Sequence, residues 1–294
     1  MDRKQKILRH VDKNGYGIEV GPSYNPVTPK SDNYNVQVID HLNREQLIEK
    51  YKVHNVNIDA IEEVDFVWKG ESFSELTGVS KHYDWIIASH IIEHTPDLIG
   101  FLNDCDLILK DDGMLSLVVP DKRCMFDYFR PITGISKIID NHLLKKKKHT
   151  PGTLAESFLN VVKKSDKIVW DLNTDGKYSL FHTLEEAVEH SKSAINNDDY
   201  VDTHAWCFVP HSFRLIINDL FHLGYIPFKE VCFYQTAGCE FFITLSRTGQ
   251  GIGMSRREML TIIDSEIMEG ICQEKKHKAS NSKFKKIIKR LLKK

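Results

Sequence analysis

The chain has 294 residues, of which 41% are hydrophobic and 28% are charged, and its formal net charge is −1 at pH 7. These values are typical of a globular protein with a full core, so one large domain with an elaboration accounts for the length. The balanced charge argues against a general nucleic-acid coat protein. No run approaches the ~20 apolar residues of a membrane span. The first six residues lack the apolar run of a secretory signal, so we expect a cytoplasmic protein.

The cysteines are scattered and have neither the Cys-x-x-Cys pairs nor the short spacings that are typical of zinc sites. Free thiols in a reducing compartment are therefore expected. The six positions are 105, 124, 207, 232, 239 and 272.

The most informative stretch, residues 15–23, predicts a short buried strand that runs into a tight turn. Gly21 and Pro22 end the strand, and a glycine lets a ligand approach the main chain closely. A second buried strand over 35–39 ends at Asp40. An acid at this position can accept hydrogen bonds from a ribose diol. The two strands together predict a site for a nucleoside-containing cofactor.

The turn after Gly21 lacks the second and third glycines of a dinucleotide fingerprint, and it lacks the Lys-Ser/Thr pair of a phosphate-binding loop. A cofactor without a pyrophosphate needs neither feature. S-adenosylmethionine (SAM) fits, because it has a ribose and an adenine but no phosphate. A nucleotide-sugar dehydrogenase that uses NAD is disfavoured for the same reason.

Strand and helix patterns alternate along the next part of the chain. We predict helices over 43–52 and 96–109 and strands over 64–67, 83–88 and 114–119. This alternation predicts a doubly wound α/β fold with a mainly parallel sheet, in which ligands bind outside the carboxyl ends of the strands. Five polar residues are expected on that rim: Glu19, Asp40, Ser89, His90 and Asp121.

The second half of the chain contains an insertion and a closing unit. Residues 122–205 break the alternation, and we interpret them as a helical insertion or cap. An amphipathic helix is expected over 211–223, and the segments 225–234 and 240–246 read as two neighbouring strands. We therefore assign residues 1–250 to one domain with an internal cap.

Residues 251–294 read as a helical tail, with a helix over 254–276 and a basic amphipathic segment over 283–294. Such a segment can lie in the plane of an anionic membrane, where each lysine or arginine contributes about 1 kcal/mol. The alternatives are a helix packed on its own domain and a disordered basic tail. Five apolar residues form the stripe of this segment: Phe284, Ile287, Ile288, Leu291 and Leu292.

These motifs resemble those of the class I SAM-dependent methyltransferases. Residues 17–23 look like the first motif of that family, Asp40 matches its ribose-binding acid, residues 84–94 look like its fourth strand with the following Glu-His, and residues 109–120 look like its fifth strand. The resemblance covers residues 10–125 and resumes in the closing hairpin. It implies a Rossmann-like seven-stranded sheet with an antiparallel C-terminal hairpin strand, SAM as cofactor and S-adenosylhomocysteine as product.

Within this family the chain is most similar to the methyltransferases of bacterial surface-polysaccharide (O-antigen or capsule) biosynthesis. The narrower match rests on residues 21–26, 89–94, 120–123 and 204–206. It implies methyl transfer to a hydroxyl, or a terminal phosphate, of a surface glycan or of its lipid-linked or nucleotide-sugar precursor. Because such glycans grow on lipid carriers, it also favours a peripheral position at the membrane for the tail.

Other functions stay open beside this one. A small-molecule or lipid-headgroup methyltransferase would carry the same cofactor motifs, and a non-catalytic binding protein could keep the fold. A nucleic-acid methyltransferase is disfavoured, because no Asn/Asp-Pro-Pro-Tyr/Phe motif follows the fourth strand.

The resemblance places the cofactor on residues that follow the first four strands. Trp68 offers a flat face for the adenine, although a tryptophan at a strand end also suits core packing. The acid usual in the loop after the third strand is not obvious, and Glu71 is the only candidate. The expected cofactor residues are Glu19, Gly21, Pro22, Ser23, Asp40, Trp68, Gly70, Ser89 and His90.

Methyl transfer to a hydroxyl requires a base that removes its proton or a metal that lowers its pKa. His90 and His94 are four residues apart and are expected to share a helical face, as base, metal ligand or structural residues. Ile91 stands where the zinc-protease pattern has a glutamate, so we expect no metal. The catalytic candidates are His94, Asp121 and His204.

The substrate candidates flank the rim on both sides of the insertion. Lys122 and Arg123 could hold a phosphate or an acidic sugar, and the alternative is a salt-bridged loop. Trp206 could stack on a sugar ring, or it could belong to the core.

Overall fold

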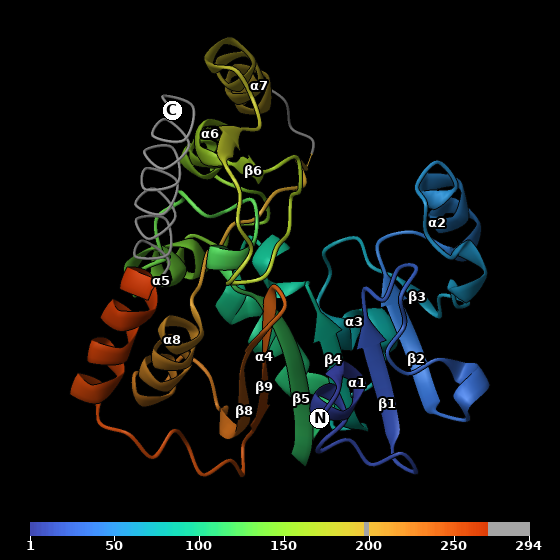
Figure 1. Cartoon of the computed structure of the whole chain (residues 1–294). Helices are drawn as coiled ribbons and strands as arrows, with labels where there is room; N and C mark the ends of the chain where they lie inside the picture. The colour runs from blue at the N-terminus through green and yellow to red at the C-terminus, as the bar shows by residue number, and fades with distance from the viewer. Residues whose placement is uncertain (197–199, 270–294) are drawn as a thin grey trace, which may run out of the picture.

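A computed structural model of the protein describes residues 1–196 and 200–269 (Figure 1). The expected amphipathic segment 283–294 lies outside the described residues. Seven strands form the main sheet in the order β3-β2-β1-β4-β5-β9-β8, and β6 and β7 pair separately. The strands of the main sheet are β1 (Tyr16–Val20), β2 (Asn35–Asp40), β3 (Phe66–Val67), β4 (Tyr83–Ser89), β5 (Leu109–Pro120), β8 (Lys229–Ala237) and β9 (Glu240–Ser246).

Helices cover the sheet and build the insertion. The α-helices are α1 (Arg3–Ile7), α2 (Arg44–Tyr51), α3 (Phe73–Thr77), α4 (Leu98–Ile108), α5 (Ile135–Leu143), α6 (Pro151–Asn160), α7 (Leu184–Asn196) and α8 (Pro210–His222). Short 3-10 helices are η1 (Lys30–Asp32), η2 (Ile58–Ala60), η3 (Ile92–His94) and η4 (Lys122–Cys124). Asn43 caps α2 in a reciprocal pair with Gln46, as the sequence predicts.

The predicted sheet architecture is confirmed. Strands β3, β2, β1, β4 and β5 pair in parallel, and β9 runs antiparallel to both β5 and β8. One difference lies at β5, which begins at Leu109 instead of near Met114. Tyr83 pairs with Leu109 and Trp85 with Met114, so β5 carries extra residues at this bulge where a helix end and a turn were expected.

The core explains why β4 is a continuous apolar strand. Ile86 and Ala88 belong to a hydrophobic cluster on one face of the sheet, whereas Trp85 and Ile87 belong to the cluster on the other. Covering both faces is the usual condition of a parallel sheet. Gly17 of β1 leaves room for the Trp85 ring, since a Cβ at Gly17 would lie 2.1 Å from it.

The insertion stands at the end of the sheet where the parallel strands finish (Figure 1). It contains α5, α6, α7 and the antiparallel pair β6 (Val162–Lys164) and β7 (Tyr178–Leu180). Within the insertion, Phe126 donates its N–H to Ile168, and Ala205, at the end of the insertion, donates its N–H to Glu93. The insertion is therefore hydrogen-bonded to the loop that follows β4.

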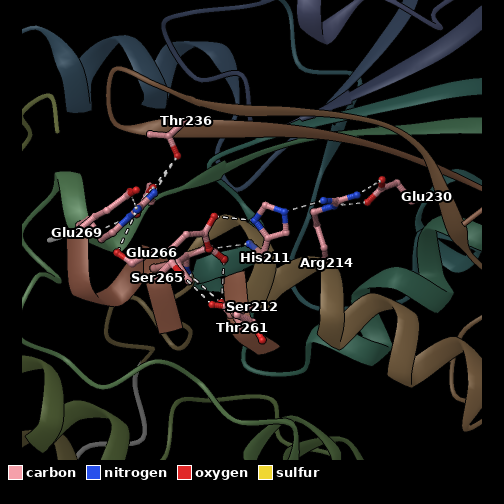
Figure 2. A network of polar contacts seen from close by, with 12 residues as sticks. His211, Ser212, Arg214, Glu230, Thr236, Thr261, Ser265, Glu266 and Glu269 are labelled. Atoms are coloured by element: carbon pink, nitrogen blue, oxygen red, sulfur yellow. Dashed lines mark hydrogen bonds and ion pairs between the residues drawn. The ribbon is translucent and has the colours of Figure 1, made fainter. Parts of the chain in front are cut away.

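The chain after β9 returns to the domain as a helix over residues 256–269. Figure 2 shows the buried polar chain that holds it: Glu266 accepts from His211 of α8, and Arg214 links that histidine to Glu230 of β8. The bond between His211 Nδ1 and Glu266 Oε1 is 2.7 Å long. The described part of the expected tail thus packs on the domain.

The five cysteines of the described residues are free thiols, as expected. None of the helices within residues 1–196 and 200–269 has the length and apolar character needed to cross a membrane.

Candidate active site

The turn after β1 passes close to two other segments. Gly21 has the left-handed φ of 65° and donates its N–H to Ile39 of β2 at 2.7 Å. A Cβ on Gly21 would lie 2.1 Å from Cδ1 of Ile91. The backbone conformation therefore favours glycine here, and a side chain would in addition displace the end of the Ile91 side chain.

Glu19 organises the loop that follows this turn. Its Oε1 accepts from the Val27 N–H at 2.7 Å, and its Oε2 accepts from Thr28 N and Oγ1 at 2.9 and 2.6 Å. Burial raises the pKa of the Glu19 carboxyl, and these bonds offset the effect only in part. Both oxygens are used by the loop, so the structure shows Glu19 as a support for the turn.

Asp40 ends β2 beside the same turn. Its Oδ2 accepts from Ser23 N at 3.0 Å, and its Oδ1 accepts from His41 N at 2.7 Å and lies 2.6 Å from His41 Nδ1. The residue is 2% exposed. The sheet thus joins the acid at the end of β2 to the turn after β1, as the sequence predicts from the two strand ends.

Trp68 and Gly70 follow β3 at the same rim. Trp68 donates its backbone N–H to Asp40 O at 2.8 Å, and its indole N–H to Glu71 O at 2.7 Å. Its ring lies edge-on to Phe73, with centroids 5.2 Å apart. Glu71 accepts from the Lys69 N–H. Trp68 therefore packs on the core and adjoins Asp40 through its main chain.

The predicted helical face shared by His90 and His94 is wrong. His90 adopts a left-handed φ of 55°, and the 3-10 helix η3 starts only at Ile92, so the two side chains leave the chain in different directions. His90 Nε2 lies 2.8 Å from Glu240 of β9, which also binds Arg3. Burial lowers the pKa of His90, but the bond to Glu240 and the charge of Glu93 outweigh it and raise the pKa overall.

His94 and His204 meet where the insertion closes over the rim. Their rings are perpendicular, with centroids 4.7 Å apart. His94 Nδ1 lies 2.7 Å from Asp202, and His204 Nδ1 lies 2.5 Å from Asp127. Each Nδ1 is thus held by a carboxylate, which leaves Nε2 as the remaining ring nitrogen.

The two carboxylates are strongly acidic. Burial raises the pKa of Asp127, but the charges of His204 and Arg130 and their hydrogen bonds lower it to about 2. The hydrogen bond from His94 is the main cause that lowers the pKa of Asp202 to about 2. Both acids are therefore ionised and orient the imidazoles.

Glu93 completes this cluster. It is 0% exposed, and neither carboxylate oxygen has a hydrogen-bond partner among the described residues. The nearest ion-pairing group is Nδ1 of His90, at 3.5 Å. One ligand atom from each of Glu93, His94 and His204 lies within 4.8 Å of the others. These three residues, which we name the Glu-His-His cluster, fit the requirements of a metal-binding site.

Another buried histidine adjoins the cluster. His149, just before α6, has neither ring nitrogen hydrogen-bonded within the described chain, and its ring lies 5.2 Å from that of Tyr200. Tyr200 donates its hydroxyl to His94 O. Burial and then the charge of His94 lower the pKa of His149 to about 4, so this imidazole is neutral at pH 7.

Glu93, Asp127, His149 and Asp202 are not among the site residues predicted from the sequence. Glu93 stands inside the Glu-His pair that follows the fourth strand, and Asp202 stands two residues before His204. The position of these two acids close to His94 and His204, which were predicted as site residues, is the sequence signal that could have identified them. Nothing comparable singles out Asp127 or His149.

The loop after β5 is held by a buried ion pair. Asp121 is 0% exposed and binds Arg123 through both of its oxygens, with Nη2 to Oδ2 at 2.6 Å. Thr236 also donates to Asp121, and Arg123 donates to the backbone oxygen of Glu266 and to the side chain of Glu269 in the C-terminal helix. Arg123 thus belongs to a salt-bridged loop, which is the alternative that the sequence left open. Both carboxylate oxygens that Asp121 would need to act as a base are bound within this loop.

Lys122 and Trp206, the other two predicted substrate contacts, both donate hydrogen bonds to backbone oxygens of the protein. Lys122 donates to Tyr128 O at 2.6 Å, and burial lowers its pKa. Trp206 is 1% exposed and donates its indole N–H to Thr95 O at 2.7 Å. Trp206 therefore takes the core position that the sequence left open.

No protein-family model matches the chain, and no curated protein sequence does either. Solved structures share the arrangement of the chain at low identity. One, a SAM-dependent methyltransferase from Aquifex aeolicus, is 12% identical, with 83% of this chain and 88% of that chain covered and a TM-score of 0.41. These values describe a distant likeness of fold.

Two further solved structures share the fold at similarly low identity. A Burkholderia thailandensis N1-methyltransferase with bound 1,6-didemethyltoxoflavin and S-adenosylhomocysteine is 9% identical, with 84% and 76% covered and a TM-score of 0.42. A protein from Rhodobacter sphaeroides described as a Zn-dependent alcohol dehydrogenase is 12% identical, with 85% and 91% covered and a TM-score of 0.46. At this level the likeness concerns the fold and says nothing of substrate.

Proposed function

We propose that this protein is a SAM-dependent methyltransferase that modifies a hydroxyl, or a terminal phosphate, of a surface glycan or its lipid-linked or nucleotide-sugar precursor. One observation carries the cofactor assignment: Asp40, at the end of β2, accepts the N–H of Ser23 in the turn after β1. An acid and a main-chain turn therefore adjoin at the carboxyl edge of a parallel sheet, the edge at which nucleosides bind in such folds.

The cofactor would lie along this rim. Its ribose would bind Asp40, and its adenine would lie against the β3 loop at Trp68 and Gly70. The methionine part would run from Gly21, Pro22 and Ser23 towards Ser89 and His90. Glu19 supports this arrangement through the loop it holds. The turn offers no phosphate cradle, which suits SAM better than NAD.

The chemistry is an in-line displacement at the methyl carbon. The acceptor oxygen forms the new C–O bond while the C–S bond breaks and its electron pair stays on sulfur, which leaves S-adenosylhomocysteine. The acceptor must also lose its proton, because a sugar hydroxyl is a poor nucleophile at neutral pH. We propose that His94 and His204 bring this about, either as bases or through a bound cation.

The substrate part of the proposal rests on the polysaccharide-type motifs and on the rim residues. Lys122 has a cationic side chain at the loop after β5 and is proposed to contact an acidic or phosphorylated sugar. The ion pair between Asp121 and Arg123 would hold this loop in position. The basic segment 283–294 is proposed to hold the protein at an anionic membrane, where lipid-linked precursors lie.

A labelled-methyl assay tests this function. The purified protein is incubated with methyl-labelled SAM and, in parallel, lipid-linked glycans, nucleotide sugars, small hydroxylated metabolites and lipid headgroups. Label on a glycan or a nucleotide sugar supports the proposal. Label only on a small metabolite or a headgroup would establish the alternative methyltransferase, and SAM binding without transfer to any acceptor would favour a non-catalytic binding protein.

A further inference from the structure

The Glu-His-His cluster contains a buried carboxylate that accepts no hydrogen bond from the described residues. Glu93 is 0% exposed, and its two oxygens accept no hydrogen bond from the described chain. An ionised carboxylate in such a place is expensive unless a cation or a set of donors balances it. The one ion-pairing contact of this carboxylate among the described residues, from His90 Nδ1 at 3.5 Å, is too long for good hydrogen-bond geometry, and the other nitrogen of that ring, Nε2, binds Glu240. The cluster therefore has at its centre a buried carboxylate that no hydrogen bond from the described chain satisfies.

Two imidazoles supply nitrogen ligands next to this carboxylate. In both His94 and His204 the Nδ1 atom is bound to an acid, Asp202 at 2.7 Å and Asp127 at 2.5 Å. A carboxylate behind Nδ1 fixes the tautomer and directs Nε2 outwards, which is the arrangement found behind metal-ligating histidines. Asp127 is itself held by Arg130 at 2.8 Å, so its orientation is fixed.

Two hydrogen bonds hold together the segments that carry the cluster. Ala205 N donates to Glu93 O at 2.6 Å, and Trp206 Nε1 donates to Thr95 O at 2.7 Å. These bonds tie η3, which carries Glu93 and His94, to the segment that carries His204. Ligand atoms within 4.8 Å of one another can therefore converge on one ion by small side-chain movements.

From this geometry we infer that Glu93, His94 and His204 bind one divalent transition-metal ion. Two imidazole nitrogens and one carboxylate oxygen suit Zn²⁺, Co²⁺, Mn²⁺ or Fe²⁺ better than Mg²⁺ or Ca²⁺, which prefer oxygen ligands. Three protein ligands leave at least one coordination position for an exogenous oxygen. This inference replaces the sequence expectation of no metal, which rested on the missing zinc-protease pattern.

The use of the ion rests on the proposed function, whereas its binding does not. An acceptor hydroxyl that occupies the open position would have its pKa lowered, as a zinc-bound water does. Its proton would pass to water, and the resulting oxygen would attack the methyl carbon. His94 and His204 would then activate the acceptor through the ion instead of as free bases.

Metal binding can be measured on the tag-free full-length protein after treatment with a chelator. Calorimetric titration with Zn²⁺ and with Co²⁺ should give about one site per chain, and the Co²⁺ absorption spectrum should report nitrogen and oxygen ligands. Mg²⁺ should bind at least tenfold more weakly. Failure of Zn²⁺ and Co²⁺ to bind to folded protein would overturn the inference.

Variants locate the site. Glu93→Gln keeps the shape of the side chain and should weaken Zn²⁺ binding at least tenfold, and His204→Gln should do the same. His142→Gln is the matched control, because His142 also pairs with an acid, Asp97, but lies outside the cluster. Equal Zn²⁺ affinity in wild type, Glu93→Gln and His204→Gln would refute the assignment.

Thermal unfolding supplies a second readout that separates a lost ligand from a lost fold. Zn²⁺ should raise the Tm of the wild type and of His142→Gln, but not that of folded Glu93→Gln. A Zn²⁺-dependent rise in Glu93→Gln equal to the wild type would contradict the inference. Titration with SAM in the presence of chelator distinguishes the two proposals. If the protein binds SAM but no metal, only the metal-site inference is refuted. If it binds metal but no SAM, only the methyltransferase proposal is refuted.

Discussion

His94 and His204 lie edge to face with ring centroids 4.7 Å apart, although one follows the fourth strand and the other closes the insertion. Each is backed by its own carboxylate, and the carboxylate of Glu93 lies beside them with no hydrogen bond from the described residues. The insertion thus completes a polar cluster at the rim of the sheet that neither segment could form alone. The following predictions test the cofactor turn, this cluster and the stability of the fold around them.

Asp40→Ala should weaken SAM binding at least tenfold, which corresponds to about 1.4 kcal/mol and is typical of losing hydrogen bonds to a charged group. Calorimetric titration measures the affinity. Asp84→Ala is the control, since Asp84 binds Tyr16 N and Lys110 near the amino ends of β1 and β4. If Asp40→Ala binds SAM as well as Asp84→Ala does, Asp40 does not hold the ribose.

Gly21→Ala should both destabilise the protein and weaken SAM binding. The left-handed φ of 65° makes a side chain there unfavourable by about 1–2 kcal/mol, and its Cβ would meet Ile91. Gly78→Ala separates the two effects, because Gly78 has a φ of 70° with no atom within 4 Å of a Cβ. Gly78→Ala should lose stability and keep its SAM affinity; an equal loss of affinity in both variants would disprove a special role for the β1 turn.

Asp127→Asn should destabilise the protein by about 3 kcal/mol, because it leaves the buried guanidinium of Arg130 with a weakened partner. Denaturant unfolding measures the change. Asp202→Asn removes the same charge from a side chain that is 67% exposed and should cost at most about 1 kcal/mol. Similar losses in the two variants would show that Asp127 is not a buried electrostatic anchor.

Asp104→Asn should stabilise the protein above pH 6 and leave it unchanged near pH 4. Burial, and then the charges of Asp97 and Glu75, raise the pKa of Asp104 from 3.8 to about 6. A carboxyl whose pKa is raised in the folded state binds its proton more tightly there, so stability falls as the pH rises from about 4 through 6. The gain in the variant should be about 1 kcal/mol, allowing for solvent screening of this half-buried group.

Thermal unfolding of wild type and Asp104→Asn at pH 4 and pH 8 measures this difference. A Tm gain of the same size at both pH values would trace the effect to packing instead of the charge.

Truncation after Ser282 should abolish sedimentation with anionic liposomes, because it removes the basic amphipathic segment. Neutral liposomes provide the control, and the wild type should bind them weakly. Persistent binding of the truncated protein to anionic liposomes would show that another surface makes the contact.

The sequence predicted the sheet well because its signals there are local. Buried runs such as residues 83–88, the capping pair Asn43 and Gln46, and the closing hairpin each depend on neighbouring residues. The position of Asp40 beside the β1 turn followed from the rule that parallel strands end on one edge. The bulge at the start of β5 was missed, since no local residue pattern specifies it.

The site was predicted less completely because its contacts join distant segments. His94 and His204 were selected, but their acids, Asp202 and Asp127, were not. The left-handed backbone of His90 replaced the expected helix and turned its ring towards Glu240. The pairing of Asp121 with Arg123 and the burial of Trp206 depend on tertiary packing, which residue spacing does not determine.

The central claim is that the rim around Gly21 and Asp40 binds SAM. Calorimetric titration of the purified, folded protein with SAM, and with NAD in parallel, tests it most directly. We predict micromolar binding of SAM and no binding of NAD. Absence of SAM binding, or binding of NAD in its place, would contradict the account.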